Sequence, residues 1–263
     1  IASTHPWRLF FEAYEPIKRA AALGQLTKGY KTLAVAGTHG KTSTSAILTH
    51  LLTSAGLDPT AFIGGILSSS RTNYRLGNGP WMIVEADEFD RSFLHLHPTA
   101  AAITTTDADH LDIYDDETDL NNTFDAFIQQ VEGPTFTATS LKNTTAVGSA
   151  DSHAFATDIR AHEGAYAFTL HLGNDKFETK LFMPGKHNVY NAVLAAALAH
   201  YAGLSLEQIA ADLPTFEGIK RRFEYHLKGK TTLIEDYAHH PTELEALIDS
   251  LDEMYPEKDI LLC

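Results

Sequence analysis

The chain has 263 residues, of which 44% are hydrophobic, and its formal net charge is −14 at pH 7. A chain of this length and hydrophobicity can bury a sizeable core, as one large domain plus smaller pieces. The negative charge argues against broad binding to nucleic acid or to an acidic membrane surface, because both attract basic surfaces. A local loop or a metal ion can still bind phosphate on an acidic protein, so small anionic ligands remain possible.

Cys263 is the single cysteine of the sequence, so no internal disulfide can form, which fits a reducing, cytoplasmic location. No apolar run approaches the roughly 18 residues that a membrane helix needs, and no signal-peptide pattern is visible. The chain begins with Ile1 and stops at "KDILLC", which reads as the start of a buried strand. We therefore expect a piece of a longer protein.

The first clear unit is a strand, a glycine loop and a helix. The apolar run "KTLAVAG" (31–37) predicts a buried strand. Apolar residues then recur at helical spacing from Ile47 to Ala55, and Gly56 is a plausible C-terminal stop. The intervening "GTHGKTS" (37–43) is typical of a phosphate-binding loop, although Val35 stands where the G-x-x-x-x-G-K-[ST] pattern has its first glycine.

A phosphate loop works because backbone N–H groups and a helix N-terminus converge on an anion. A lysine reaches the outer phosphates, and the next hydroxyl holds the metal. In this chain these roles fall to Gly37 through Gly40, Lys41 and Thr42. The alternative is a turn of small residues that contains a lysine by chance, since short motifs give false positives.

Two more apolar runs, "WMIVEA" (81–86) and "TAAAIT" (99–104), predict neighbouring strands, and a helix is expected between Asp119 and Val131. Strands that alternate with helices favour an α/β fold with a mostly parallel sheet. In such sheets, ligands bind outside the carboxyl ends of the strands.

Acidic residues and a histidine follow these two strands. Glu85 comes directly after the first run and is well placed to hold Mg²⁺ beside a nucleotide, whereas Asp87 and Asp90 are as well explained by a solvated turn. His110 follows the second run; a lone histidine is more often a packed or surface residue than a ligand. However, His110, Glu85 and the phosphate loop all follow strands that end at the same edge of the sheet. This shared position favours a binding site over a chance histidine.

From about Pro134 the chain changes to short, Thr-rich, alternating segments, which predict a smaller antiparallel β portion. Residues 165–185 read as a hairpin that turns at Gly173-Asn174-Asp175. A helix is predicted over 187–203, and a capping box of Ser205 with Gln208 begins another.

The last part of the chain predicts the start of a further α/β unit. The segment "TTLIEDY" (231–237) reads as a strand, and a helical stretch follows from about Pro241. "EDYAHHP" (235–241) offers Asp236, His239 and His240 as polar side chains. Arg222, in "RRF", and Asp236 could clamp a nucleotide together or could pair with each other.

Asn188 and Asn191 stand three residues apart at a helix start and share one face of the helix. Their amides could recognise the edge of an adenine, or they could cap the helix. Both interpretations stay open from the residues alone.

Six motifs in order carry a resemblance to a known family. They are "GTHGKTS", "VEADEFDRSF", "DADHLDIY", "GKHNVYN", "FEGIKRRF" and "EDYAHHPTE". Together they resemble the Mur ligases, the ATP-dependent amide-forming enzymes of peptidoglycan precursor synthesis, from about Lys18 to Cys263. The phosphate loop of that family is of the short form seen here, so Val35 fits the resemblance.

The resemblance implies a fold and a domain order. A P-loop ATPase domain with a mostly parallel sheet is flanked by helices and carries the antiparallel portion. Residues 1–28 would be the tail of an N-terminal UDP-sugar domain or a linker. Residues 29–217 would be the central ATP-binding domain, and 218–263 the truncated start of a C-terminal ligase domain.

The resemblance also implies roles for single residues. Lys41 would contact the γ-phosphate, and Thr42, Glu85 and His110 would serve magnesium ions; Lys41, Glu85 and His110 would be catalytic. The implied ATP-binding residues are Gly37, Thr38, His39, Gly40, Lys41, Thr42, Ser43, Asn188, Asn191, Arg222 and Asp236. Among these, Asn188 and Asn191 would hold the adenine, and Arg222 and Asp236 would reach the nucleotide from the junction with the last domain.

Within the family, the motifs look most like those of the members that join L-alanine to UDP-N-acetylmuramic acid through an acyl phosphate, with ATP and Mg²⁺. The alternatives are a ligase that adds a preformed peptide to the same sugar in wall recycling, a P-loop kinase, or a fragment that binds nucleotide without turnover. The family often has Thr-Asn-Ile-Glu where Thr104-Thr105-Thr106-Asp107 stands, so a substrate contact of that asparagine is not carried over.

Overall fold

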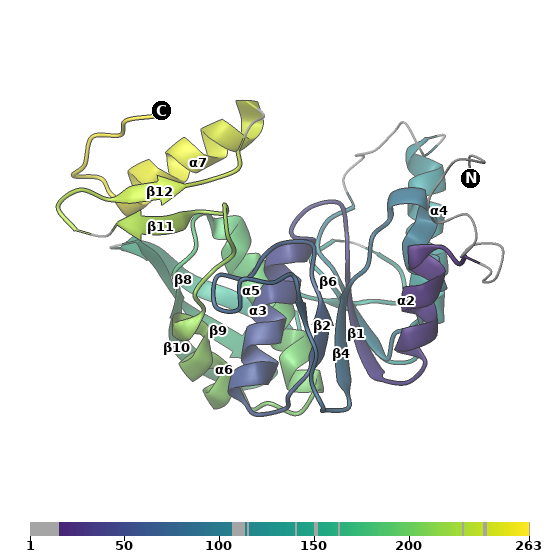
Figure 1. The fold of residues 1–263 in the computed structure, drawn as a ribbon. Coiled ribbons are helices and arrows are strands. Elements are labelled where there is room, and N and C mark those ends of the chain that lie inside the picture. Colours follow the sequence, from purple (N-terminus) through teal and green to yellow (C-terminus); the bar gives the residue numbers. More distant parts are fainter. Residues whose placement is uncertain are drawn as a thin grey trace, which may run out of the picture.

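The computed structural model describes residues 16–106, 114, 116–139, 141–149, 152–162, 164–227, 229–238 and 241–262. Its central feature is a seven-stranded sheet with helices on both faces (Figure 1). The strand order is β3-β2-β4-β1-β5-β6-β7, and each pairing is parallel except that of β2 with β3. The strands are β1 (Lys31–Ala36), β2 (Thr60–Phe62), β3 (Tyr74–Arg75), β4 (Trp81–Glu85), β5 (Ala100–Ile103), β6 (Thr135–Thr137) and β7 (Thr145–Ala146).

Helices of this central unit connect the strands or follow them. They are α2 (Arg19–Thr27), α3 (Lys41–Ser54), η1 (Phe89–His95, a 3-10 segment), α4 (Glu117–Gln130), α5 (Lys186–Tyr201), α6 (Leu206–Asp212) and η2 (Leu213–Thr215, also 3-10). In Figure 1, α3 and α5 lie on one side of the sheet, and α2 and α4 lie on the other.

Strand β1 shows why helices cover both faces of the sheet. Leu33 and Val35 belong to a buried cluster with residues of α3 and α5, whereas Ala34 and Ala36 belong to a second cluster with residues of α4 and η1. Because both faces are covered, the strand reads as a continuous apolar run and not as an alternating one.

Helix α5 lies close to the sheet and to α3. It contacts α3, β5 and β6, and its central residues Ala195, Ala196, Ala197 and Ala199 are fully buried. The distance between packed helices depends on the side chains at the contact, so these methyl groups allow a close approach. The start of α5 is thereby brought beside the start of α3.

A three-stranded antiparallel sheet of β8 (Ala154–His162), β9 (Ala165–Leu172) and β10 (Asp175–Leu181) packs on α5 and α6. The predicted hairpin is confirmed: β9 and β10 are joined by Gly173-Asn174, and Gly173 has φ of 59°. A glycine at the first central position suits a tight two-residue turn. The predicted capping box of α6 is also present, with Gln208 N donating to Ser205 Oγ at 3.2 Å and Ser205 N donating to Gln208 Oε1 at 2.9 Å.

The last unit consists of the β11–β12 hairpin (Glu224–Leu227 and Leu233–Glu235) and helix α7 (Pro241–Met254). Figure 1 shows it at the end of the molecule beyond β8. Tyr166 Oη in β9 donates to Glu253 Oε2 of α7 at 2.7 Å, and Glu253 Oε1 pairs with Lys186 Nζ at 3.0 Å. These contacts tie α7 to the start of α5.

The expected fold class, α/β with a mostly parallel sheet and a smaller antiparallel portion, is confirmed. The Thr-rich texture after Pro134 does not mark the start of the antiparallel portion, because β6 and β7 extend the large sheet in parallel. Strands of two or three residues are too short to show a hydrophobic period in the sequence. In the part of the chain that the structure describes, no helix has the length and apolarity that crossing a membrane requires.

Replacing Phe127 by alanine tests the packing of α4 on the sheet. Phe127 is fully buried, and its ring stacks on Phe93 with centroids 4.7 Å apart. We expect Phe127→Ala to lower the free energy of unfolding by about 3–5 kcal/mol, measured by urea denaturation. The control Phe177→Ala removes a ring that is 41% exposed and should cost less than about 1 kcal/mol. Equal losses for the two variants would contradict the packing described.

Candidate functional site

The loop between β1 and α3 has the backbone of an anion cradle. Gly37 and Gly40 have φ of 124° and 84°, values that favour glycine. A Cβ on Gly37 would lie 2.2 Å from Thr104 Oγ1, and one on Gly40 would lie 2.6 Å from Asn191 Oδ1. The first hydrogen bond of helix α3 runs from Thr44 N to Gly40 O. The N–H groups of residues 41–43 lie before this bond, in the first turn, where a helix offers its N–H groups no partner of its own. Donors in this position bind anions.

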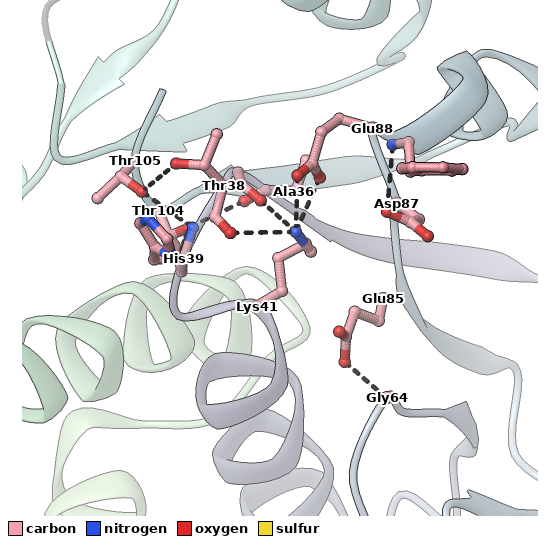
Figure 2. A network of polar contacts seen from close by, with 12 residues as sticks. Ala36, Thr38, His39, Lys41, Gly64, Glu85, Asp87, Glu88, Thr104 and Thr105 are labelled. Carbon is pink, nitrogen blue, oxygen red and sulfur yellow. Dashed lines mark hydrogen bonds and ion pairs between the residues drawn. The ribbon is translucent and has the colours of Figure 1, made fainter. Parts of the chain in front are cut away.

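Two threonines that follow β5 hold the loop in shape (Figure 2). Thr105 O accepts from Thr38 N at 2.9 Å, and Thr105 Oγ1 accepts from His39 N at 3.1 Å and lies 2.9 Å from Thr38 Oγ1. Thr104 Oγ1 donates to Ala36 O at 3.2 Å and to His39 O. Thr105, which stands where the family often has asparagine, therefore supports the loop through its hydroxyl group and its main-chain oxygen.

Lys41 forms a buried ion pair with Glu88 (Figure 2). Lys41 Nζ lies 2.8 and 3.0 Å from the two carboxylate oxygens of Glu88, and it donates to Gly37 O at 2.6 Å. The two side chains are 13% and 1% exposed. Tyr114 Oη donates to the main-chain oxygen of Glu88 at 2.5 Å, and burial, with the Glu88 charge, raises the pKa of Tyr114 to about 12.

Glu88 belongs to the acidic stretch that the sequence places at the end of β4, but the sequence assigns it no role of its own. The signal that could have found it is its place three residues after Glu85, just beyond the end of the strand. The same stretch also reads as a solvated acidic turn, which hides that signal. Asp87 and Asp90 are exposed, which agrees with the solvated alternative for those two residues.

Glu85 and Thr42 meet beside the loop. Thr42 Oγ1 donates to Glu85 Oε1 at 3.0 Å, and Gly64 N donates to Glu85 Oε2 at 2.6 Å. A hydroxyl and a carboxylate oxygen are hard ligands of the kind that Mg²⁺ takes in nucleotide sites, so these two residues fit the implied metal. His110, the third predicted ligand, lies outside the described residues.

Gly64 and Gly65, which follow β2, allow this arrangement. A Cβ on Gly64 would lie 2.5 Å from Glu85 Oε1, and a Cβ on Gly65 would lie 2.7 Å from Thr42 Cγ2. Neither glycine is singled out by the sequence. The signal that could have found them is a glycine pair directly after a strand, at the same sheet edge as Glu85.

A pocket of about 450 Å³ opens between the phosphate loop, the start of α5 and the last unit. The predicted site residues that border it are Thr38, His39, Gly40, Lys41, Thr42, Ser43, Glu85, Asn188, Asn191, Arg222 and Asp236. The lining residues that the sequence does not single out are Met183, Pro184, His187, Tyr237, Ala238, Leu247 and Ser250. Gly37 is part of the loop but is not one of the lining residues.

The two asparagines of α5 are buried and contact each other. Asn188 Nδ2 donates to Pro184 O at 2.6 Å, and Asn191 Nδ2 donates to Asn188 Oδ1 at 3.1 Å. Asn191 also packs against Gly40 of the phosphate loop. Both amides therefore support the helix start, and they border the pocket, where contact with an adenine stays a prediction.

Asp236 joins two parts of the last unit. Its carboxylate accepts from Phe223 N at 2.8 Å and from Ala238 N at 2.7 Å. Within the described ranges, no salt bridge joins Asp236 to Arg222, so the two line the pocket without forming the pair considered above. The roles of both in nucleotide binding remain predictions.

His187 is a further titratable group of the pocket. Its side chain keeps contact with solvent, yet the surrounding pocket wall removes enough water to lower its pKa, and the nearby Arg222 charge acts in the same direction. Asp236 acts in the opposite direction. A lowered pKa favours the neutral imidazole at neutral pH, so His187 adds a polar but uncharged group to the pocket.

Replacing Gly64 by alanine tests whether Glu85 must stay in place. The added Cβ would meet Glu85 Oε1 at 2.5 Å, so the carboxylate has to move away from Thr42. We expect Gly64→Ala to weaken Mg²⁺-dependent ATP binding about tenfold, a change of about 1.4 kcal/mol. Calorimetric titration of the chain with ATP, with and without Mg²⁺, measures this.

The matched control is Gly29→Ala, where a Cβ would find its nearest neighbour at 3.6 Å, an ordinary contact. This control should bind like the wild-type chain. Wild-type affinity in the folded Gly64→Ala variant would show that the position of Glu85 does not matter for binding.

Comparison with known proteins places this site in a family. The family described as Mur ligase middle domain matches residues 35–199, and the family described as Mur ligase, glutamate ligase domain matches residues 221–263. UDP-N-acetylmuramate–L-alanine ligases of Flavobacterium psychrophilum and Christiangramia forsetii are 45% and 46% identical to the chain over 97% and 94% of it. The chain spans 58% and 56% of the length of these two relatives.

Solved structures agree with the sequence matches. The crystal structure of a UDP-N-acetylmuramate–alanine ligase from Thermotoga maritima is similar with a TM-score of 0.79 and 30% identity, over 89% of this chain and 56% of that one. A UDP-N-acetylmuramate:L-alanyl-γ-D-glutamyl-meso-diaminopimelate ligase from Neisseria meningitidis gives a TM-score of 0.71 and 25% identity, over 81% and 74%. The middle-domain match alone covers more than half of the chain. The chain therefore belongs to the Mur ligase family.

Proposed function

We propose that the longer protein represented by this chain is an ATP-dependent ligase that joins L-alanine to UDP-N-acetylmuramic acid. The observation that carries the proposal is the meeting of Lys41, Thr42 and Glu85 beside a phosphate loop that borders a pocket of about 450 Å³. The similarity to UDP-N-acetylmuramate–L-alanine ligases supports the choice of substrates. The chain spans about 58% of such a relative, and it holds the phosphate loop and the pocket, so its own part in the proposed reaction is to bind ATP.

The proposed reaction has two steps. The γ-phosphoryl group of ATP passes to the carboxylate of the muramoyl sugar, which releases ADP and leaves an acyl phosphate. The amino group of L-alanine attacks this acyl carbon, an amide forms and inorganic phosphate leaves. The first step brings two anions together, so it requires positive charge and N–H donors around the transferred group.

Residues of this chain would meet that requirement. The ammonium of Lys41 would neutralise the outer phosphates, and the N–H groups of residues 41–43 would bind phosphoryl oxygens at the helix N-terminus. Thr42 and Glu85 would hold Mg²⁺, and His110 would join them on the family resemblance. Magnesium bound there would neutralise charge on the phosphate oxygens. Asn188, Asn191, Arg222 and Asp236 would border the rest of the nucleotide.

A second candidate is a ligase that joins a preformed peptide to the same sugar carboxylate. The structural similarity to the Neisseria enzyme favours it, because that enzyme's name specifies a peptide as the amine and its TM-score is 0.71. The phosphate loop and the metal residues would serve both reactions alike. The two candidates differ only in the pocket for the amine.

The test uses the longer protein, extended at both ends. We expect phosphate release from UDP-N-acetylmuramic acid and Mg·ATP when L-alanine is added, and little with a cell-wall tripeptide. Phosphate release only with the tripeptide would indicate the second candidate, a ligase that adds a preformed peptide. Release that needs neither amine would indicate a different phosphate-transfer enzyme.

In the same assay, Lys41→Ala should lower phosphate release by at least about 10³-fold, since one positioned charge at a transferring phosphoryl is worth this much. Lys28→Ala removes an exposed lysine and should leave the rate unchanged. Near-normal release from folded Lys41→Ala would remove Lys41 from the reaction.

A further inference from the structure

Lys41 is already surrounded by oxygen acceptors of the protein. Its ammonium meets two oxygens of Glu88 at 2.8 and 3.0 Å and the main-chain oxygens of Gly37 and Thr38 at 2.6 and 3.4 Å. A lysine ammonium has three N–H donors. A phosphate that binds Lys41 would therefore compete with these partners for the same three donors.

Glu88 contacts Lys41 but does not itself line the pocket. Lys41 is a lining residue of the pocket and Glu88 is not, and Figure 2 shows the lysine turned toward Glu88 and the loop carbonyls. A phosphate in the pocket and the Glu88 carboxylate would thus meet the same ammonium. Both are anions, so they compete for it.

The main chain around Glu88 is firmly held. Its main-chain oxygen accepts from Tyr114 Oη at 2.5 Å and from Arg91 N at 2.9 Å, and Glu88 itself is fully buried. The next turn contains Asp90 and Arg91 at φ of 54° and 52°, the left-handed region that non-glycine residues adopt rarely. Such strain persists where the surroundings enforce it, and it concentrates at switches and ligand sites.

We propose that Glu88 is a positioning residue: it holds Lys41 in the buried ion pair, and the outer phosphate of a bound nucleotide takes its place on the ammonium. This inference rests on the proposed binding of ATP at the loop. Nucleotide binding is then an exchange of one anion for another, and its affinity contains the cost of separating Lys41 from Glu88. Weakening that pair makes the chain bind Mg·ATP more tightly.

The experiment is a calorimetric titration of this chain with Mg·ATP. Glu88→Gln keeps the size of the side chain and removes its charge, and we expect about tenfold tighter binding. Asp87→Asn is the matched control, because it removes one negative charge from the neighbouring, exposed position. This control should change the affinity less than about twofold. Unchanged or weaker binding in folded Glu88→Gln would overturn the proposal.

A double-mutant cycle shows whether the effect passes through Lys41. With Lys41→Met as the background, adding Glu88→Gln should change the affinity less than about twofold; a full tenfold gain there would overturn the proposal. Glu88→Asp covers the case in which Glu88→Gln does not fold. It keeps the buried charge but draws the carboxylate back by one methylene, so binding should tighten several-fold, and weaker binding would count against the proposal.

The failure of this inference can be told apart from the failure of the proposed function. Absence of Mg·ATP binding by the wild-type chain would overturn both. Binding by the wild-type chain, together with equal affinities in Glu88→Gln and Asp87→Asn, would overturn only the role of Glu88.

Discussion

The pairing of β1 between β4 and β5 is the constraint on which the site depends. Val35 is in register with Glu85 on one side and with Ala102 on the other, so three carboxyl ends emerge side by side. The phosphate loop leaves β1, the carboxylate of Glu85 ends β4, and the threonines that hold the loop in shape follow β5. Hydrogen bonds between buried main chains therefore set the distances among groups that lie far apart in sequence.

Much of this fold could be predicted because its signals are local. The apolar run of β1, the glycine turn of the β9–β10 hairpin and the capping box at Ser205 each lie within a few residues, and each is found as predicted. Glu85 is predictable for a related reason, because it stands at the end of a buried strand. The short strands β6 and β7 carry no period, so their place in the large sheet is decided by tertiary pairing alone.

The parts that could not be predicted depend on contacts across the chain. Glu88 looks like its exposed acidic neighbours until the turn after β4 buries it against Lys41. Gly64 matters because its main chain lies so close to Glu85, 21 positions further on, that a Cβ would meet the carboxylate. His187 lines the pocket together with residues of α7 and of the segments next to the β11–β12 hairpin, which lie far from it in sequence. For His110 the prediction stands on sequence alone.

The alanine-rich centre of α5 has a consequence for how such a sequence can drift. The helix lies against both α3 and the sheet, and its first turns carry the amide that touches Gly40. A larger side chain at Ala195 or Ala196 would push α5 away from α3 and the sheet, because protein interiors are close-packed and leave no room for extra atoms. Neutral change is therefore restricted at positions that do not line the pocket, because the methyl groups of α5 set the distance between this helix and the phosphate loop.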